Sequence, residues 1–232
     1  MVEGISKINK KNHIIDLVVI GFISLVILLI GGIIFPVLKI NVTNKALLLQ
    51  VLIWSLTEYG LMGLGITIIC ILRKESFVSF GLKKDKVVLT LALSILPCLP
   101  ELIKTIIKKG NIIYFPFQGV NFTKPVLSSG FPINVIGIIL IVTSWGFFEG
   151  FTYSVISDRI NKLFPVDSIF LNRGAIICGI LCVLMHMVGH TYSGIDALCT
   201  FFVIYGMLVI YKYTGNAWGC VFIHLVFWNA IA

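Results

Sequence analysis

The chain keeps a carboxylate, Glu149, in the middle of the aromatic and aliphatic run "SWGFFEGFTYSVISDRI". An unpaired carboxylate in hydrocarbon costs several kcal/mol, so we expect side chains on other segments to satisfy or use it. Tyr153 follows one helical turn later on the same face, where its hydroxyl could donate to the carboxylate or to a substrate oxygen. A carboxylate held in this way is suited to act as a general base that takes a proton from water.

Three histidines follow in segments that are otherwise apolar. His186 and His190 are four residues apart in "LCVLMHMVGH", and a helix would place both on one face. His224 lies in "GCVFIHLVFWNA", and Asn229 comes five residues after it. Imidazole nitrogens and carboxylate oxygens are usual zinc ligands, so Glu149, His186 and His224 form a candidate site for a divalent metal such as zinc. His190 is the weaker candidate, because it precedes "TYSG" and can simply end its helix.

Three further acidic residues lie in or beside apolar segments, namely Glu58, Glu101 and Asp196. Glu101 directly follows "LPCLP", which indicates a helix break near the membrane interface. Asp196 is expected at the start of a helix, where a carboxylate complements the helix dipole. Glu58 has a weaker case for function than Glu149. The six cysteines are expected to be buried small hydrophobic residues, with no disulfide framework.

The composition indicates the elements that must position these side chains. Apolar residues make up 58% of the 232 residues and charged residues 12%, against about 45–50% and about 25% in soluble domains. We therefore predict an all-α, polytopic bundle of six or seven transmembrane helices. It forms one membrane-embedded domain over residues 1–232, with the candidate site residues within 133–232. The predicted spans are approximately 14–35, 47–72, 87–107, 133–156, 169–188, 195–211 and 217–232.

The distribution of charge predicts the orientation in the membrane. The lysine-rich segment 73–86 is expected on the cytoplasmic side together with the N-terminus, whereas the aromatic segment 110–132 is expected at the opposite interface as a lid or re-entrant piece. The net charge of +8 is explained by such loops facing anionic lipid. The chain contains no nucleic-acid-binding motif, so nucleic acid is not an expected partner.

The order of these motifs resembles the CPBP family of intramembrane metalloproteases, the CAAX-protease and bacteriocin-processing group. Glu149 in "FFEGFTYS" matches the first glutamate of the family's first motif, and His186 in "LCVLMHM" matches the histidine of the second. "YKYTGNAWGCVFIHLVFWN" is similar to the last motif, with His224 as its histidine. At four positions the chain departs from the family pattern: Gly150 replaces the second glutamate, Ser154 an arginine and Cys182 a phenylalanine, and Asn229 comes one residue late.

The resemblance implies a metal-dependent endopeptidase in a prokaryotic cell membrane, acting on a membrane-associated or lipidated peptide. Glu149 would activate water, a histidine or Asn229 would stabilise the oxyanion, and Tyr153 would position one of the reacting groups. Two alternatives are open. The chain could be an inactive family member that serves as an immunity or membrane-binding protein, or it could transport a metal ion or protons.

Overall fold

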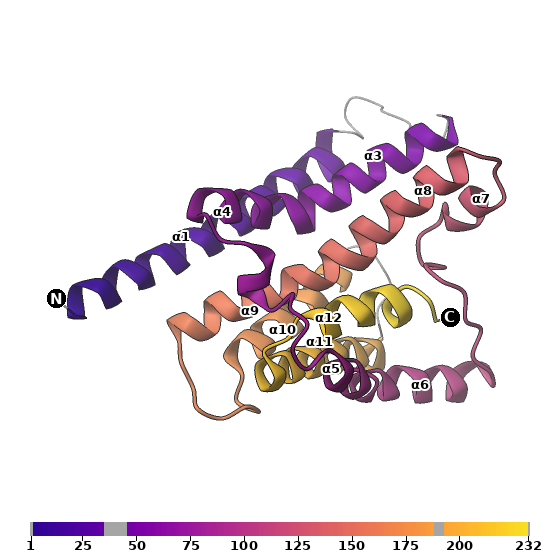
Figure 1. Cartoon of the computed structure of the whole chain (residues 1–232). Helices are drawn as coiled ribbons and strands as arrows, with labels where there is room; N and C mark the ends of the chain where they lie inside the picture. The colour runs from indigo at the N-terminus through magenta and orange to yellow at the C-terminus, as the bar shows by residue number, and fades with distance from the viewer. Residues whose placement is uncertain (1, 35–45, 188–192, 232) are drawn as a thin grey trace.

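The computed structural model describes residues 2–34, 46–187 and 193–231. Within these residues the chain is helical, and the only β-type pairing is an isolated bridge between Tyr114 and Ile231. The predicted all-α fold is therefore confirmed (Figure 1). The helices are α1 (Val2–Leu29), α3 (Leu47–Tyr59), α4 (Gly65–Arg73), α5 (Val87–Leu93), α6 (Leu99–Lys109), α7 (Thr123–Leu127), α8 (Ile133–Ile141), α9 (Glu149–Leu163), α10 (Arg173–Met187), α11 (Gly194–Thr214) and α12 (Trp218–Ile223).

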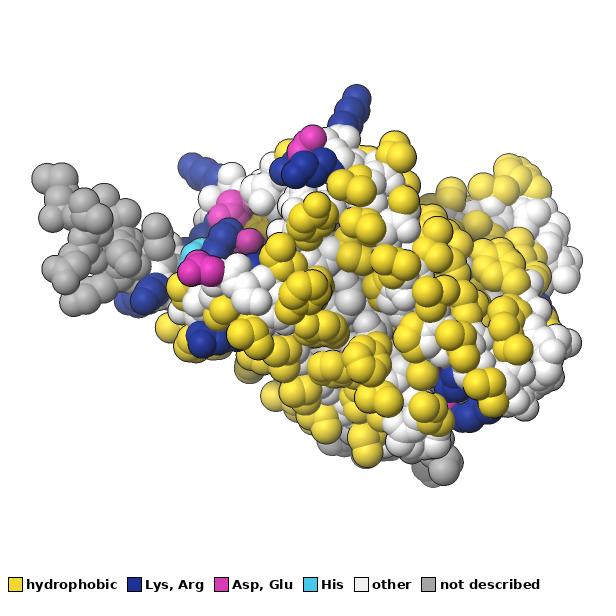
Figure 2. Space-filling view, turned by 90° about the horizontal axis from the view of Figure 1, so that it is seen from below, with side chains coloured by type: hydrophobic (Ala, Val, Ile, Leu, Met, Phe, Trp, Pro, Cys, Tyr) yellow, Lys and Arg dark blue, Asp and Glu magenta, His cyan; other side chains and the backbone are white. Residues whose placement is uncertain are grey.

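Within the described residues, five helical stretches are long and apolar enough to cross a membrane, and they make the chain a multi-pass membrane protein. They are Lys10–Gly32, Leu47–Arg73, Val87–Lys109, Ile133–Leu163 and Gly194–Thr214. The predicted fifth and last spans correspond to the shorter apolar helices Arg173–Met187 and Trp218–Trp228. Figure 2 shows one face of the bundle largely covered by hydrophobic side chains, with most of the visible charge gathered toward the end where α1 begins.

Helix α9 lies at the centre of the bundle and contacts α1, α10, α11 and α12. Close helix approach in membranes depends on small residues at the crossings, because there is no hydrophobic force to bring helices together in lipid. Gly65 is one such residue, since an added Cβ would lie 2.9 Å from the Cα atom of Ile20 on α1. All six cysteines are free and buried, as predicted.

The described residues contain four short π-helical segments. One, η1 (Ile30–Ile34), follows α1; the others are η2 (Gly60–Leu64), η5 (Val142–Phe148) and η6 (His224–Trp228), and η5 contacts both η2 and η6. A π-helix bonds each residue to the one five positions away, which changes the phase of the side chains that follow, and such segments occur frequently at functional sites. Glu58 stands just before η2, Glu149 directly after η5, and His224 begins η6.

The two long loops pack at opposite ends of the continuous helix formed by α12 and η6. In the basic loop, Lys83 and Asp85 accept hydrogen bonds through their carbonyls from the Asn216 side chain, just before α12. In the 110–132 loop, the backbone amides of Phe115 and Gly119 each donate 3.0 Å bonds, to the carbonyls of Ala230 and Asn229. The loop predicted to act as a lid thus covers the end of η6 that carries Asn229.

A buried ion network joins α1 to α4 and α9. Arg159, which is 2% exposed, pairs with Asp16 at 3.0 Å, with Asp158 at 3.5 Å and with Glu75. Asp16 also pairs with Arg73 at 2.9 Å. The arginine is thus buried among acidic groups from three parts of the chain.

Candidate active site

Glu149 and His224 meet in the buried core where η5 and η6 contact each other. Glu149 is 8% exposed and His224 is 1% exposed. The Nε2 atom of His224 lies 4.0 Å from the Oε1 atom of Glu149. The glutamate comes from the start of α9 and the histidine from the end of α12, so two segments 75 residues apart in the sequence form this pair.

The hydrogen bond on the other side of the His224 ring fixes its tautomer. Nδ1 lies 3.0 Å from the carbonyl oxygen of Cys220, one turn earlier on the same helix. A carbonyl can only accept a hydrogen bond, so in the neutral ring Nδ1 carries the proton and Nε2 keeps its lone pair. This Nε2 atom is buried and has no hydrogen-bond partner among the described residues. The lone pair therefore points toward Glu149 and is open to bind a small species.

Two side chains at the end of η6 lie beside the Glu149 carboxylate. The Nδ2 atom of Asn229 donates to Oε2 over 3.5 Å, and the Trp228 side chain lies near the carboxylate. In a regular α-helix, Asn229 would point well away from His224, about 140° around the axis. The π-helical segment η6 changes this direction. Because π-helical hydrogen bonds join residues five positions apart, Asn229 lies about one turn beyond His224 on the same side of the helix.

Glu58 also lies near this site, although the sequence indicated a weaker case for its function than for that of Glu149. It lies on α3, in the second span, close enough to Glu149 for the two carboxylates to interact electrostatically. The sequence already indicated this role. Burying the Glu58 carboxylate within an apolar span costs as much free energy as burying Glu149 within its own span. Glu58 supplies a second carboxylate from a different helix.

Gly150 cannot supply that second carboxylate. A Cβ atom added to it would lie 2.6 Å from the carbonyl oxygen of Cys220 and 2.9 Å from the Cα atom of Val221. Both contacts are with the backbone of α12, so no larger side chain fits unless α9 and α12 separate. Gly150 is therefore a packing residue that allows Glu149 to approach His224.

Tyr153 points into the bundle, as predicted, and its ring supports His224. The two rings stack with centroids 5.8 Å apart and an interplanar angle of 28°. The Tyr153 hydroxyl lies near the Cys182 thiol on α10. The predicted positioning of Glu149 or a substrate oxygen by this hydroxyl stays a prediction, and the contact with the site that the structure shows is the stacking of the ring on His224.

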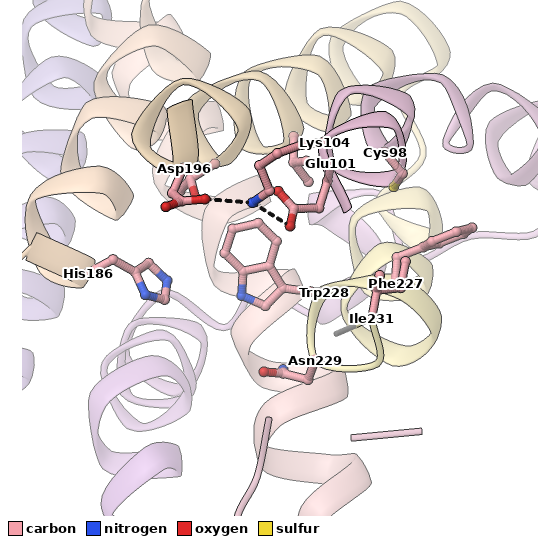
Figure 3. Close-up of a pocket in the computed structure, with 11 residues that line it drawn as sticks. Cys98, Glu101, Lys104, His186, Asp196, Phe227, Trp228, Asn229 and Ile231 are labelled. Atoms are coloured by element: carbon pink, nitrogen blue, oxygen red, sulfur yellow. Dashed lines mark hydrogen bonds and ion pairs between the residues drawn. The ribbon is translucent and has the colours of Figure 1, made fainter. Parts of the chain in front are cut away.

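His186 and His224 both contact the Trp228 ring. The centroid of that ring is 5.7 Å from the His186 ring and 5.6 Å from the His224 ring. His186, Trp228 and Asn229 line a pocket of about 250 Å³ (Figure 3). The structure therefore pairs Glu149 with His224 at 4.0 Å and brings His186 against the same indole ring as His224. His190 lies outside the described residues.

The same pocket has a second polar wall, formed by α6 and the start of α11. Lys104 pairs with Glu101 at 2.7 Å and with Asp196 at 2.9 Å, as Figure 3 shows. Asp196 also forms a capping box with Ser193 at the start of α11, which agrees with its predicted place at a helix N-terminus. Trp228 and Asn229 line this pocket, and Asn229 also bonds Glu149.

The described residues supply only part of a zinc site. His224 Nε2 and Glu149 Oε1 are suitable donors, but a tetrahedral zinc would hold two such atoms about 3.4 Å apart and needs at least one more protein ligand. Within residues 2–34, 46–187 and 193–231, no three His, Cys, Asp or Glu side chains come together as a metal-ligand set. A water molecule that bonds both atoms at about 2.8 Å is compatible with their 4.0 Å separation. Zinc binding at this site therefore stays a prediction.

No protein-family model, no characterised protein and no solved structure matches this chain.

Proposed function

We propose that this protein is an intramembrane hydrolase that cleaves a peptide bond in a membrane-associated or lipidated peptide, using water activated by Glu149 and His224. The observation that carries the proposal is the buried lone pair of His224 Nε2, which faces Glu149 Oε1 at 4.0 Å and has no partner among the described residues. Leaving such an atom unsatisfied costs about 1–3 kcal/mol, so its retention favours a bound reactant.

The reaction follows from the positions of the side chains. Glu149 accepts a proton from the water while the water oxygen attacks the carbonyl carbon of the substrate, and His224 Nε2 accepts the second hydrogen of the water to orient it. The amide of Asn229 donates to the oxygen of the tetrahedral intermediate. Its 3.5 Å bond to Glu149 is long, so little is lost when the amide turns to the substrate. The proton on Glu149 then passes to the leaving nitrogen as the C–N bond breaks, which yields a carboxyl group and an amine.

The surrounding residues hold this arrangement in place. Tyr153 and Trp228 lie against the His224 ring, at 5.8 Å and 5.6 Å between centroids. The neighbouring carboxylate of Glu58 can hold or release a proton during the cycle, which suits a step that both accepts and donates protons. The pocket lined by Asn229 and Trp228 offers a polar route for water to this buried pair.

The proposal is tested with purified protein in lipid vesicles, incubated with a library of membrane-spanning and lipidated peptides. Mass spectrometry of new peptide termini should show cleavage by the wild-type protein and none by Glu149→Gln or His224→Gln. Asp85→Asn, an exposed acid-to-amide change in the basic loop, is the matched control and should cleave normally. Equal cleavage by the wild-type protein and Glu149→Gln would refute the assignment of the base.

Proton transport is a second candidate, because the half-buried Glu58 on α3 interacts electrostatically with the buried Glu149 on α9. A transporter needs polar groups from several spans, and Glu58 brings the second span into the cluster. Proton flux into vesicles, followed with a pH-sensitive dye, distinguishes the two functions. Flux that is lost in Glu58→Gln, together with an absence of peptide cleavage by the wild-type protein, would favour transport.

A further inference from the structure

A groove of about 350 Å³ runs along the bundle between α1, α9 and α10. It is distinct from the polar pocket next to Trp228, and its floor includes Tyr153, whose ring stacks on His224. Its walls are almost entirely aliphatic; among the residues that line it are Leu17, Gly21, Leu28, Ile156, Leu181 and Met185.

The polar side chains along the groove are already satisfied within the protein. Ser24 Oγ donates to the carbonyl of Leu61 at 2.6 Å, and Thr152 Oγ1 donates to the carbonyls of Met62 and Phe148. The Tyr153 hydroxyl lies near the Cys182 thiol. The groove wall is therefore apolar in character, and a hydrocarbon chain is the ligand that complements it.

The helices that frame the groove face the lipid. On α1, Val18 and Phe22 are 62% and 64% exposed, and on α10 Leu184 is 51% exposed. These residues belong to a membrane-spanning helix and to an apolar helix beside it. The medium in contact with the groove is thus the acyl region of the bilayer.

The α1 face that lines the groove becomes basic toward the N-terminus. Lys10 precedes Leu17 by seven residues, and His13 precedes it by four, so all three share one side of the helix. Lys10 is exposed, and no carboxylate in the described part of the chain pairs with it. Lys10 lies about 10 Å from Leu17 along the helix axis, toward the N-terminus. This distance is comparable to the thickness of one headgroup region, which is about 5–8 Å. A lysine there can reach a lipid phosphate by extending its side chain.

We propose that this groove is a binding site for an anionic phospholipid, with one acyl chain lying between α1 and α10 and the phosphate at Lys10. The acyl chain covers the lipid-facing side of Tyr153, and the anionic headgroup offsets the unpaired positive charge at the start of the span. This lipid site stands independently of the proposed hydrolase activity.

The test uses native mass spectrometry of the purified full-length protein with phosphatidylglycerol and phosphatidylcholine of identical chains. Gly21→Phe fills the groove, because an added Cβ at Gly21 meets nothing within 4 Å. Gly32→Phe is the matched control, since Gly32 lies on the same span, also in open space, but does not line the groove. Wild type and Gly32→Phe should retain one phosphatidylglycerol, and Gly21→Phe should lose it while keeping the wild-type thermal midpoint in lipid-free detergent.

The headgroup is tested separately with Lys10→Gln. This change should lower the preference for phosphatidylglycerol over phosphatidylcholine about fivefold, the effect of one basic residue at an anionic surface. Gly21→Leu provides a smaller filling side chain in case the phenylalanine variant unfolds. Lipid retention by a folded Gly21→Leu or Gly21→Phe equal to wild type, or equal retention of the two lipids by the wild-type protein, would overturn the proposal.

Discussion

Gly150 offers a direct test of how α9, the helix that carries Glu149, is positioned against α12. Gly150→Ala should destabilise the protein, because the new Cβ would lie 2.6 Å from the Cys220 carbonyl oxygen and 2.9 Å from the Val221 Cα atom. Neither contact can be relieved by a side-chain rotation, so α9 and α12 must move apart. Overpacking of this kind costs about 1–3 kcal/mol, which lowers the thermal midpoint of a chain of this length by roughly 2–12 °C.

The assay is thermal unfolding in detergent, followed by intrinsic tryptophan fluorescence. Gly32→Ala is the control, because an added Cβ at Gly32 meets nothing within 4 Å, and it should leave the midpoint nearly unchanged or raise it slightly. Gly150→Glu, which restores the residue expected from the family resemblance, should be less stable still and should not gain activity. An unchanged midpoint in Gly150→Ala, or a more active Gly150→Glu, would refute the packing role.

Three further predictions follow from the geometry of the site and of the ion network. Tyr153→Phe keeps the ring on His224 and removes only the hydroxyl, so the thermal midpoint and peptide cleavage should both be nearly unchanged; a loss of cleavage of roughly ten- to a thousand-fold would instead show that the hydroxyl hydrogen-bonds a reacting group. The family resemblance gives His186 a role as a metal ligand and His190 none, so a zinc-dependent reaction predicts that His186→Ala abolishes cleavage and His190→Ala leaves it nearly intact. Metal analysis of His186→Ala, His224→Ala and Glu149→Ala shows which of them hold the predicted zinc, and equal loss of activity in both single histidine variants would instead favour a paired metal site. Arg159→Ala leaves Asp16 and Glu75 without their buried partner and should cost about 3–5 kcal/mol in a chemical unfolding experiment, and a cost below about 1 kcal/mol would show that water reaches the network.

The sequence was sufficient to predict the helical membrane fold and the partnership of Glu149 with His224. Hydropathy marks the spans because backbone groups in lipid must be satisfied within helices, and the cost of an isolated carboxylate in hydrocarbon requires a partner. The inward position of Tyr153 followed from its spacing to Glu149 on one helix, which α9 preserves.

Other parts of the site depend on features that helical spacing does not contain. The π-helical turn at His224 changes the direction of Asn229, and no residue pattern in "HLVFWN" signals that change. Glu58 comes from a span 91 residues before Glu149, so its place depends on how α3 packs against η5. The steric role of Gly150 becomes visible only when the backbone of α12 is in place. Sequence spacing within one helix was therefore informative, whereas contacts between helices were not predictable from it.

The most direct test of the central claim follows the oxygen atom of the attacking water. Purified protein in lipid vesicles is incubated with the peptide library in water enriched in oxygen-18, and the products are analysed by mass spectrometry. Activation of water by Glu149 and His224 predicts one heavy oxygen in the new C-terminal carboxyl group of each product of the wild-type protein, and no such products from Glu149→Gln. Labelled products from Glu149→Gln at the wild-type rate, or their absence from the wild-type reaction, would contradict the account.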